Sequence, residues 1–287
     1  MDIMSDGFEK YLFGLTDATP GVNYVQELQQ HVRTALERTE IRFNDLQPIG
    51  SFAKHLMLGG PSVAVVDMLC SVEPGVLSSN GPDLLAQVDS SLELSADVRF
   101  LFREVGLRAN VVFGCRRSHA SLWSILHPQD GSWIDTDPLR HIQILLDEDE
   151  KHEHRLTTLV LMLKAWNRGI GFAFTSFYLE RLATMVFGGD GIGNYGEALK
   201  WFFEAASQLV TDRLDDPCNP NNAIDPLDCA KEIAVGAELF NRARQRADVA
   251  LEYATVGRLD CAIGEWRRLL GSDFARPDAQ SDSDLIA

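Results

Sequence analysis

The sequence has no apolar run long enough to cross a membrane. A span requires about 20 consecutive predominantly apolar residues, and no stretch of the 287-residue chain approaches that length. A secretory signal typically has a basic segment followed by an apolar stretch, and the first ten residues lack this pattern. We therefore expect a cytoplasmic protein with no membrane partner.

Cysteine is sparse and unpaired. The five cysteines are isolated from one another, and none forms the Cys-x-x-Cys pair expected of a zinc site. An odd number of isolated cysteines favours free thiols in a reducing compartment. They are Cys70, Cys115, Cys218, Cys229 and Cys261.

Basic residues are few relative to acidic ones. There are 26 Lys and Arg against 42 Asp and Glu, which gives a formal net charge of −16. The phosphate backbone of nucleic acids repels such a chain, so we expect no broad nucleic-acid binding. Hydrophobic residues make up 45% of the sequence, which is enough for a packed core and excludes a disordered chain.

The first half alternates between helical and strand patterns. Apolar residues at helical spacing predict a helix over 24–38, and a polar segment at 45–48 interrupts the pattern. A run of branched aliphatic residues over 63–70 predicts a strand buried on both faces, and further strands are expected at 108–114 and 122–126. Two more helices are expected at 84–92 and 97–105.

The second half has only helical patterns. Helices are expected over five segments, and Trp201 and Phe202 are expected to face inward. The five segments are His154–Trp166, Phe177–Phe187, Glu197–Leu209, Lys231–Thr255 and Asp260–Leu270. The fold class is therefore α+β with two lobes: 1–153 with a mixed sheet, 154–275 all helical, and a flexible acidic tail at 276–287.

One short motif suggests phosphate chemistry. Gly50 and Ser51 precede the strand that contains Asp67. A Gly-Ser turn lets backbone N–H groups and a hydroxyl approach phosphate oxygens, and a carboxylate nearby can hold Mg²⁺ against the same phosphates. Gly-Ser is also a common structural turn, so this pair alone does not identify a site.

Longer stretches carry a family resemblance. Gly50–Lys54 followed by Val66–Leu69 resembles the G-S motif and metal-binding strand of the polymerase-β-like nucleotidyltransferases. Further stretches resemble the CD-NTase family, bacterial relatives of the oligoadenylate synthases and of the enzyme that makes cyclic GMP-AMP. These are Trp133–Pro138 with His141, Leu161–Arg168, Thr175–Glu180, Asp216–Asn222 and Glu265–Gly271.

The resemblance implies a two-lobed nucleotidyltransferase fold and a nucleoside triphosphate (NTP) ligand. Gly50 and Ser51 would contact the triphosphate, Lys164 would reach the same phosphates, and Ser176 would donate another hydrogen bond. In active relatives a hydroxyl attacks an α-phosphate, and three strand carboxylates hold two Mg²⁺ ions. Repeated rounds of this reaction make linear or cyclic oligonucleotide signals.

The sequence departs from the family at the metal ligands. Asp67 stands at one expected carboxylate position, but Val65 and Asn110 occupy the other two. If each lost carboxylate is worth about 3 kcal/mol, the rate falls by roughly four orders of magnitude. The sequence therefore predicts a pseudoenzyme or regulatory component of anti-phage signalling that retains NTP binding, with a weakened Mg²⁺ site at Asp67.

Two alternatives stay open. One is an active Mg²⁺-dependent nucleotidyltransferase with unusual ligands beside Asp67, and the other is a non-catalytic adaptor that binds a protein partner. Several residues also have purely structural interpretations. Lys164 could be a surface lysine and Ser176 a helix N-cap. Asp135 and Asp137 are expected to cap or brace a turn, and Trp133, Trp166 and Trp266 to lie in the core.

Overall fold

The computed structural model describes residues 3–17, 19–39, 41–59, 64–75, 107–116, 121–127, 131–189, 191–224, 227 and 229–275. The chain forms two compact units. We call them the sheet unit, Ala18–Lys151 with Asp215–Ile224, and the helical unit, Met1–Asp17 with His152–Leu214 and Asp225–Ala287. Both units are discontinuous along the sequence, so a single boundary between 153 and 154 does not reproduce this grouping.

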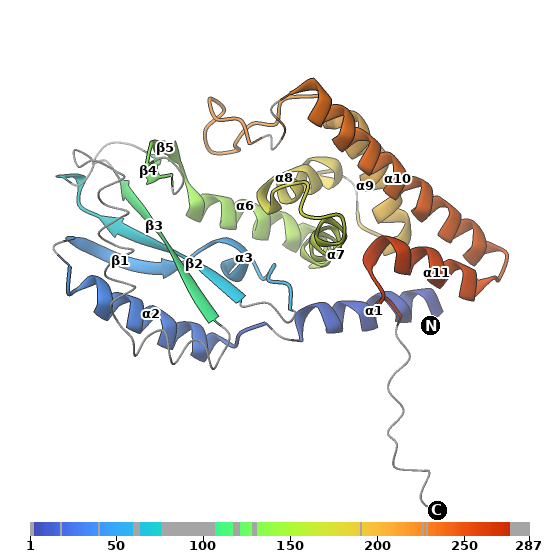
Figure 1. Cartoon of the computed structure of the whole chain (residues 1–287), viewed down its shortest axis with the longest axis horizontal. Helices are drawn as coiled ribbons and strands as arrows, with labels where there is room; N and C mark the ends of the chain where they lie inside the picture. The colour runs from blue at the N-terminus through green and yellow to red at the C-terminus, as the bar shows by residue number, and fades with distance from the viewer. Residues whose placement is uncertain are drawn as a thin grey trace, which may run out of the picture. The chain divides into compact units, whose positions relative to one another are not determined.

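The sheet unit contains a mixed five-stranded sheet with the strand order β1-β2-β3-β4-β5 (Figure 1). Its strands are β1 (Phe43–Pro48), β2 (Ala64–Val72), β3 (Leu107–Arg116), β4 (Trp123–Leu126) and β5 (Trp133–Thr136). Only β2 and β3 run parallel; the other neighbouring pairs are antiparallel.

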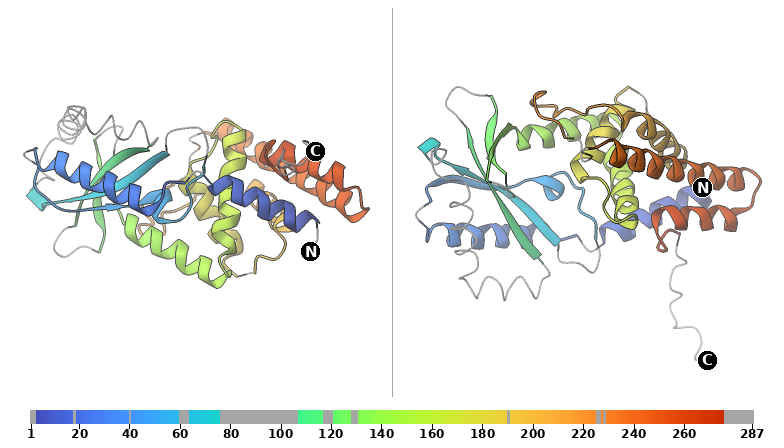
Figure 2. Two further views of the ribbon diagram at one scale, coloured as in Figure 1. Left: turned by 90° about the horizontal axis from the view of Figure 1, so that it is seen from below. Right: turned by 45° about the horizontal axis from the view of Figure 1, so that its top comes forward.

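Helix α2 (Val22–Leu36) covers one face of this sheet, as Figure 2 shows. Its apolar stripe recurs at helical spacing, so one side of the helix is buried. Alternate residues of β2 and β3, including Val66, Met68 and Phe113, pack against that stripe in one core cluster. Side chains alternate along a strand, so the intervening residues point to the opposite face.

The opposite face is covered over only part of its length. Leu69 and Val112 pack there with Leu139 and Ile142 of α6 (Pro138–Lys151). Toward the start of β2, Val65 is 46% exposed. The prediction that β2 is buried on both faces is therefore wrong at this end, because no described element packs over Val65.

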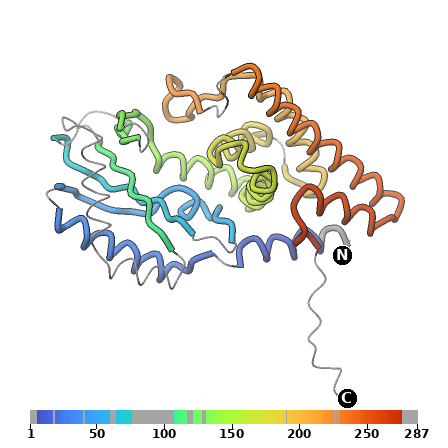
Figure 3. Tube along the Cα trace, in the orientation of Figure 1, coloured from blue at the N-terminus to red at the C-terminus, as the bar shows by residue number. Residues whose placement is uncertain are grey.

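The helical unit contains α1 (Ile3–Thr16), α7 (Arg155–Gly169), α8 (Ser176–Phe187), α9 (Tyr195–Leu209), α10 (Ala230–Thr255) and α11 (Leu259–Leu270). Helices α10 and α11 lie side by side as a hairpin (Figure 3). Aromatic rings fill much of the core: Phe174 stacks on Phe240 with ring centroids 4.4 Å apart. No helix in the described ranges has the length and apolarity that a membrane crossing requires.

The structure confirms the α+β class and most predicted elements. The helix at 24–38, the strands at 63–70, 108–114 and 122–126 and the five later helices are all present within a few residues. The helices expected at 84–92 and 97–105 lie outside the described residues. The sequence patterns did not predict α1, β1, β5 or α6.

One prediction about side-chain direction is wrong. Trp201 is 55% exposed, whereas Phe202 is fully buried. The buried residues of α9 occupy one arc of the helix, and at about 100° per residue Trp201 falls outside that arc.

Candidate nucleotide site

Four side chains lie on the sheet face opposite α2, at the end where Val65 is exposed. We call this the open end of the sheet face. In the parallel ladder between β2 and β3, Val65 pairs with Arg108 and Asp67 pairs with Asn110. Residues two apart on a strand point to the same face, and so do residues paired across strands. Val65, Arg108 and Asn110 are exposed and Asp67 is partly buried, which agrees with that placement.

Asp67 and Asn110 contact each other directly. The Asn110 side-chain amide donates a hydrogen bond from Nδ2 to Oδ1 of Asp67 at 2.7 Å. The two positions that the family resemblance treats as carboxylate ligands are thus joined by a donor–acceptor pair.

Gly50 lies against the same carboxylate. It has a φ of +63°, and a Cβ added to it would lie 2.5 Å from Oδ2 of Asp67. Both the left-handed backbone and the close approach require glycine here. The backbone N–H of Ile49 also donates to the carbonyl of Asp67 at 2.8 Å. These contacts place α3 (Gly50–Ala53), which includes Ser51, beside Asp67.

This face does not offer the ligands of a two-metal site. Two Mg²⁺ ions need several anionic oxygens, but here Asp67 is the one carboxylate among the four side chains. Val65 has no ligand atom, Asn110 directs an N–H toward Asp67, and Arg108 brings a positive charge. Among the described residues, the one cluster of His, Cys, Asp or Glu with metal-compatible spacing lies elsewhere, at His141, Asp216 and Cys218. These four side chains, among the residues that the structure describes, therefore do not fit a pair of Mg²⁺ ions.

The other two predicted phosphate ligands belong to the helical unit. Lys164 lies on α7 and is 7% exposed, so its interpretation as a surface lysine is wrong. Ser176 is the first residue of α8, but the N-cap is Thr175, whose hydroxyl accepts from the N–H of Tyr178. The structure brings Gly50, Ser51, Asp67 and Asn110 together in the sheet unit and places Lys164 and Ser176 in the other unit.

A second polar cluster of the sheet unit surrounds Asp216. This side chain accepts hydrogen bonds from His141 Nε2 at 2.7 Å, from the Thr136 hydroxyl and from the N–H of Cys218 at 2.8 Å. Burial acts to raise the pKa of Asp216, but the hydrogen bonds from His141, Thr136 and Cys218 outweigh it and lower the pKa to about 2. Asp216 is therefore a buried carboxylate that accepts three hydrogen bonds within the protein.

This cluster fastens the segment 215–224 to β5 and the start of α6. The side chains of Asn219 and Asn222 both donate to the carbonyl of Asp135 at 2.7 Å. Burial and the charges of Asp216 and Asp137 raise the pKa of the Cys218 thiol to about 11. The arrangement is best described as a structural clamp.

The structure confirms several structural interpretations made from sequence. Asp137 caps α6, because its Oδ1 accepts from the N–H groups of Leu139 and Arg140. Trp166 and Trp266 are 3% and 1% exposed, and Trp133 is partly buried against the sheet core. The clamp at Asp216 was missed, although His141 and Asp216–Asn222 had drawn attention through the family resemblance; their contact joins residues 75 positions apart.

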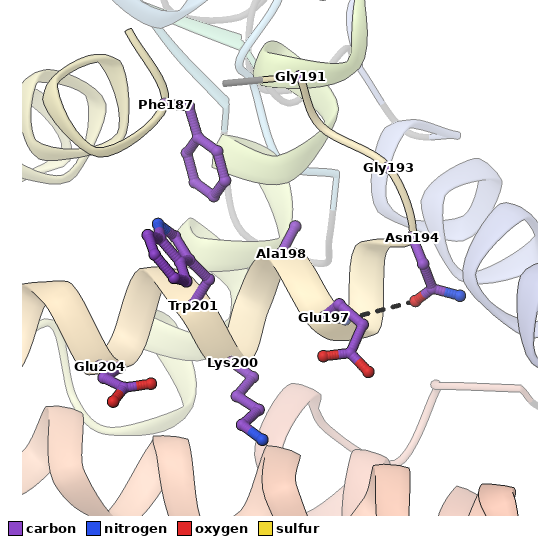
Figure 4. Close-up of a pocket in the computed structure, with 9 residues that line it drawn as sticks. All are labelled: Phe187, Gly191, Gly193, Asn194, Glu197, Ala198, Lys200, Trp201 and Glu204. Carbon is purple, nitrogen blue, oxygen red and sulfur yellow. Dashed lines mark hydrogen bonds between the residues drawn. The ribbon is translucent and has the colours of Figure 1, made fainter. Parts of the chain in front are cut away.

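The helical unit contains a cavity of about 510 Å³, and Figure 4 shows residues that line it. Its lining includes Phe187, Trp201, Glu197 and Glu204, and Lys200 points away from it toward Asp248, with which it forms a 2.5 Å ion pair. None of the predicted nucleotide ligands lines this cavity.

The sequence was compared with protein-family models and with curated proteins. No protein-family model matches the chain. A probable cyclic nucleotide synthase of Bacillus cereus (strain VD146) is 20% identical over 158 residues, which are 55% of this chain and 47% of that protein. The chain thus spans about half the length of this curated relative.

Solved structures match over nearly the whole chain. CdnC of E. coli MS115-1 with ATP has a TM-score of 0.75 at 18% identity, covering 96% of this chain and 99% of its own. The same CdnC in a complex with HORMA-deltaN matches at 0.67 and 20% identity, with 96% and 93% covered. CdnG, a CD-NTase of Bradyrhizobium diazoefficiens with GTP, matches at 0.72 and 12% identity, with 96% and 97% covered.

The chain therefore has a nucleotidyltransferase fold. More specifically, it has the fold of the CD-NTases, as the matches to CdnC and CdnG show.

Proposed function

We propose that this chain is a CD-NTase-like component of bacterial anti-phage nucleotide signalling that binds an NTP and transfers nucleotidyl groups inefficiently. Its ligands for the triphosphate are Gly50, Ser51, Lys164 and Ser176. The observation that carries the proposal is the Asn110–Asp67 hydrogen bond of 2.7 Å, which occupies the one carboxylate among the four described side chains at this end of the sheet, where catalysis needs three.

The backbone conformation of Gly50, beside Asp67, supports NTP binding. Gly50 keeps a conformation that only glycine adopts easily, directly beside Asp67. The solved relatives CdnC and CdnG contain ATP and GTP respectively, which supports an NTP as the ligand class.

A protein partner belongs to the same proposal. CdnC has been solved in a complex with HORMA-deltaN. A chain that binds nucleotide without efficient transfer would act by presenting a nucleotide-dependent surface to such a partner. This regulatory role differs from that of an unliganded adaptor, because the partner would be recognised only when nucleotide is bound.

The test is calorimetric titration of the full chain with ATP and with GTP, in Mg²⁺ buffer. We expect binding of at least one of them, and we expect Ser51→Ala to weaken it about tenfold, because a hydroxyl donor to a charged phosphate is lost. Ser207→Ala is the matched control, since Ser207 is partly buried on α9 in the helical unit and its hydroxyl donates to the carbonyl of Glu204 in the same helix. Absence of binding to both nucleotides contradicts the proposal.

A further inference from the structure

We infer that Arg108 supplies the positive charge of the nucleotide site where the family uses divalent ions, so that this chain binds the triphosphate of an NTP without Mg²⁺. The inference rests on the proposed NTP binding and adds the chemistry by which the phosphates are neutralised.

The register of β2 and β3 places Arg108 beside the two positions where the family has metal ligands. Arg108 pairs directly with Val65, the residue at a family metal-ligand position, and lies two residues before Asn110, which stands at the other. Neighbouring strands are about 4.8 Å apart, so a long side chain on β3 reaches over the space in front of Val65. Both residues are exposed, and Val65 is too short to fill that space.

No carboxylate of the described residues forms an ion pair with Arg108. Two other arginines of the sheet unit do form ion pairs: Arg33 contacts Asp45 and Arg116 contacts Asp137, each at 3.4 Å. The carboxylate of Asp67, which lies on the same face as Arg108, receives a hydrogen bond from Asn110.

The electrostatics favour a guanidinium over an ion at this face. Three carboxylates would attract two Mg²⁺ ions, whereas Asp67 and Arg108 together carry no net formal charge. A guanidinium is attached covalently, needs no ligands to hold it, and can bind phosphate oxygens with two parallel N–H groups. The chain as a whole has a net charge of −16, so an incoming polyphosphate needs a local cation.

The experiment measures the affinity of the full chain for ATP in EDTA and in excess Mg²⁺, and the affinity for AMP under the same conditions. For the wild type we expect ATP dissociation constants within about threefold of each other in the two buffers. Arg108→Ala should weaken ATP binding in EDTA by about tenfold or more and AMP binding by much less, because a charge-assisted phosphate contact is lost.

Two variants sharpen the result. Arg108→Lys keeps the charge and loses the two-pronged geometry, so we expect an intermediate loss. Arg38→Ala removes an exposed arginine just beyond α2, on the covered side of the sheet, and should change nothing. Circular dichroism of each variant verifies that the strands remain folded.

The outcomes separate this inference from the proposal on which it rests. If ATP binds only when Mg²⁺ is present, or if Arg108→Ala binds ATP as tightly as the wild type in EDTA, the role of Arg108 is overturned and NTP binding stands. If the wild type binds no NTP in either buffer, the proposed function itself fails.

Discussion

Asp67 and Asp216 both lie in the sheet unit, in contrasting surroundings. Asp216 is 3% exposed and accepts hydrogen bonds from His141, Thr136 and Cys218. Asp67 is partly buried at the open end of the sheet face, where Asn110 donates to one oxygen and the backbone of Gly50 lies against the other.

The difference separates two uses of a carboxylate. Asp216 holds a segment in place, because it is buried and three donors are directed at its carboxylate. Asp67 stands on a face with a neutral amide, a valine and an arginine, and it retains access to solvent. A buried carboxylate that accepts several hydrogen bonds, such as Asp216, contributes to stability. A partly exposed carboxylate beside the backbone of a glycine, such as Asp67, is suited to a ligand site.

The largest effect is expected from restoring the missing charges. Val65→Asp combined with Asn110→Asp gives the sheet face three carboxylates, which is the donor set that two Mg²⁺ ions require. At about 3 kcal/mol for each restored contact, Mg²⁺-dependent formation of oligonucleotides should rise about 10⁴-fold over the wild type. The readout is radiolabelled NTP separated by chromatography.

The control for this gain is Val65→Asn, which adds an oxygen ligand at the same position without its charge. It should raise the rate far less than the double variant. Equal rates for the wild type and the double variant would show that the sheet face does not limit the chemistry.

The next effect concerns stability and belongs to Asp216. Replacing it with Ala leaves the buried donors of His141, Thr136 and Cys218 without their acceptor. We expect the free energy of unfolding to fall by about 3 kcal/mol in urea denaturation. Asp212→Ala, at an exposed position, should change it by less than about 0.5 kcal/mol. Similar losses for the two variants would contradict the clamp.

The pH dependence of stability isolates the same carboxylate. The pKa of Asp216 is lowered from 3.8 to about 2 in the fold, so its contribution is fully present above about pH 4 and is lost as the pH falls toward 2. The difference in unfolding free energy between the wild type and Asp216→Asn should shrink by about 2 kcal/mol from pH 5 to pH 2. A difference that does not vary with pH would mean that Asp216 titrates normally.

A smaller effect is expected at Gly50. Ala at this position meets Oδ2 of Asp67 and takes an unfavourable positive φ, so Gly50→Ala should destabilise the fold by about 2 kcal/mol. Combining it with Asp67→Ala removes the steric part and should leave about 1 kcal/mol. Gly14→Ala, on α1 with no atom within 4 Å of an added Cβ, should be neutral or stabilising. If Gly50→Ala destabilises the fold equally with and without Asp67→Ala, the contact between Gly50 and Asp67 is not tight.

Sequence patterns predicted the elements whose burial follows a regular period. The helices α2, α7 and α8 and the strands β2 and β3 have strong apolar repeats, so their positions could be read from the residues alone. Strand β1 contains one fully buried residue, Leu46, among polar neighbours, and pairing with β2 makes it a strand. Such non-local pairing leaves little trace in the local sequence.

The candidate site was predictable in its residue types and not in its contacts. Gly50, Ser51, Asp67 and Asn110 were found because a family pattern directed attention to them. The hydrogen bond from Asn110 to Asp67 and the place of Arg108 opposite Val65 depend on the β2–β3 register, which the sequence does not specify over the intervening residues. The clamp at Asp216 was missed because its contact with His141 joins residues 75 positions apart in the sequence.

The most direct test of the account is the turnover of the wild-type chain. The protein is incubated with radiolabelled ATP and GTP in excess Mg²⁺ or Mn²⁺, together and separately, and the products are separated by chromatography. We predict nucleotide binding without multiple turnovers, because one carboxylate cannot hold two divalent ions in place. Rapid formation of cyclic or linear oligonucleotides over many turnovers would contradict the account.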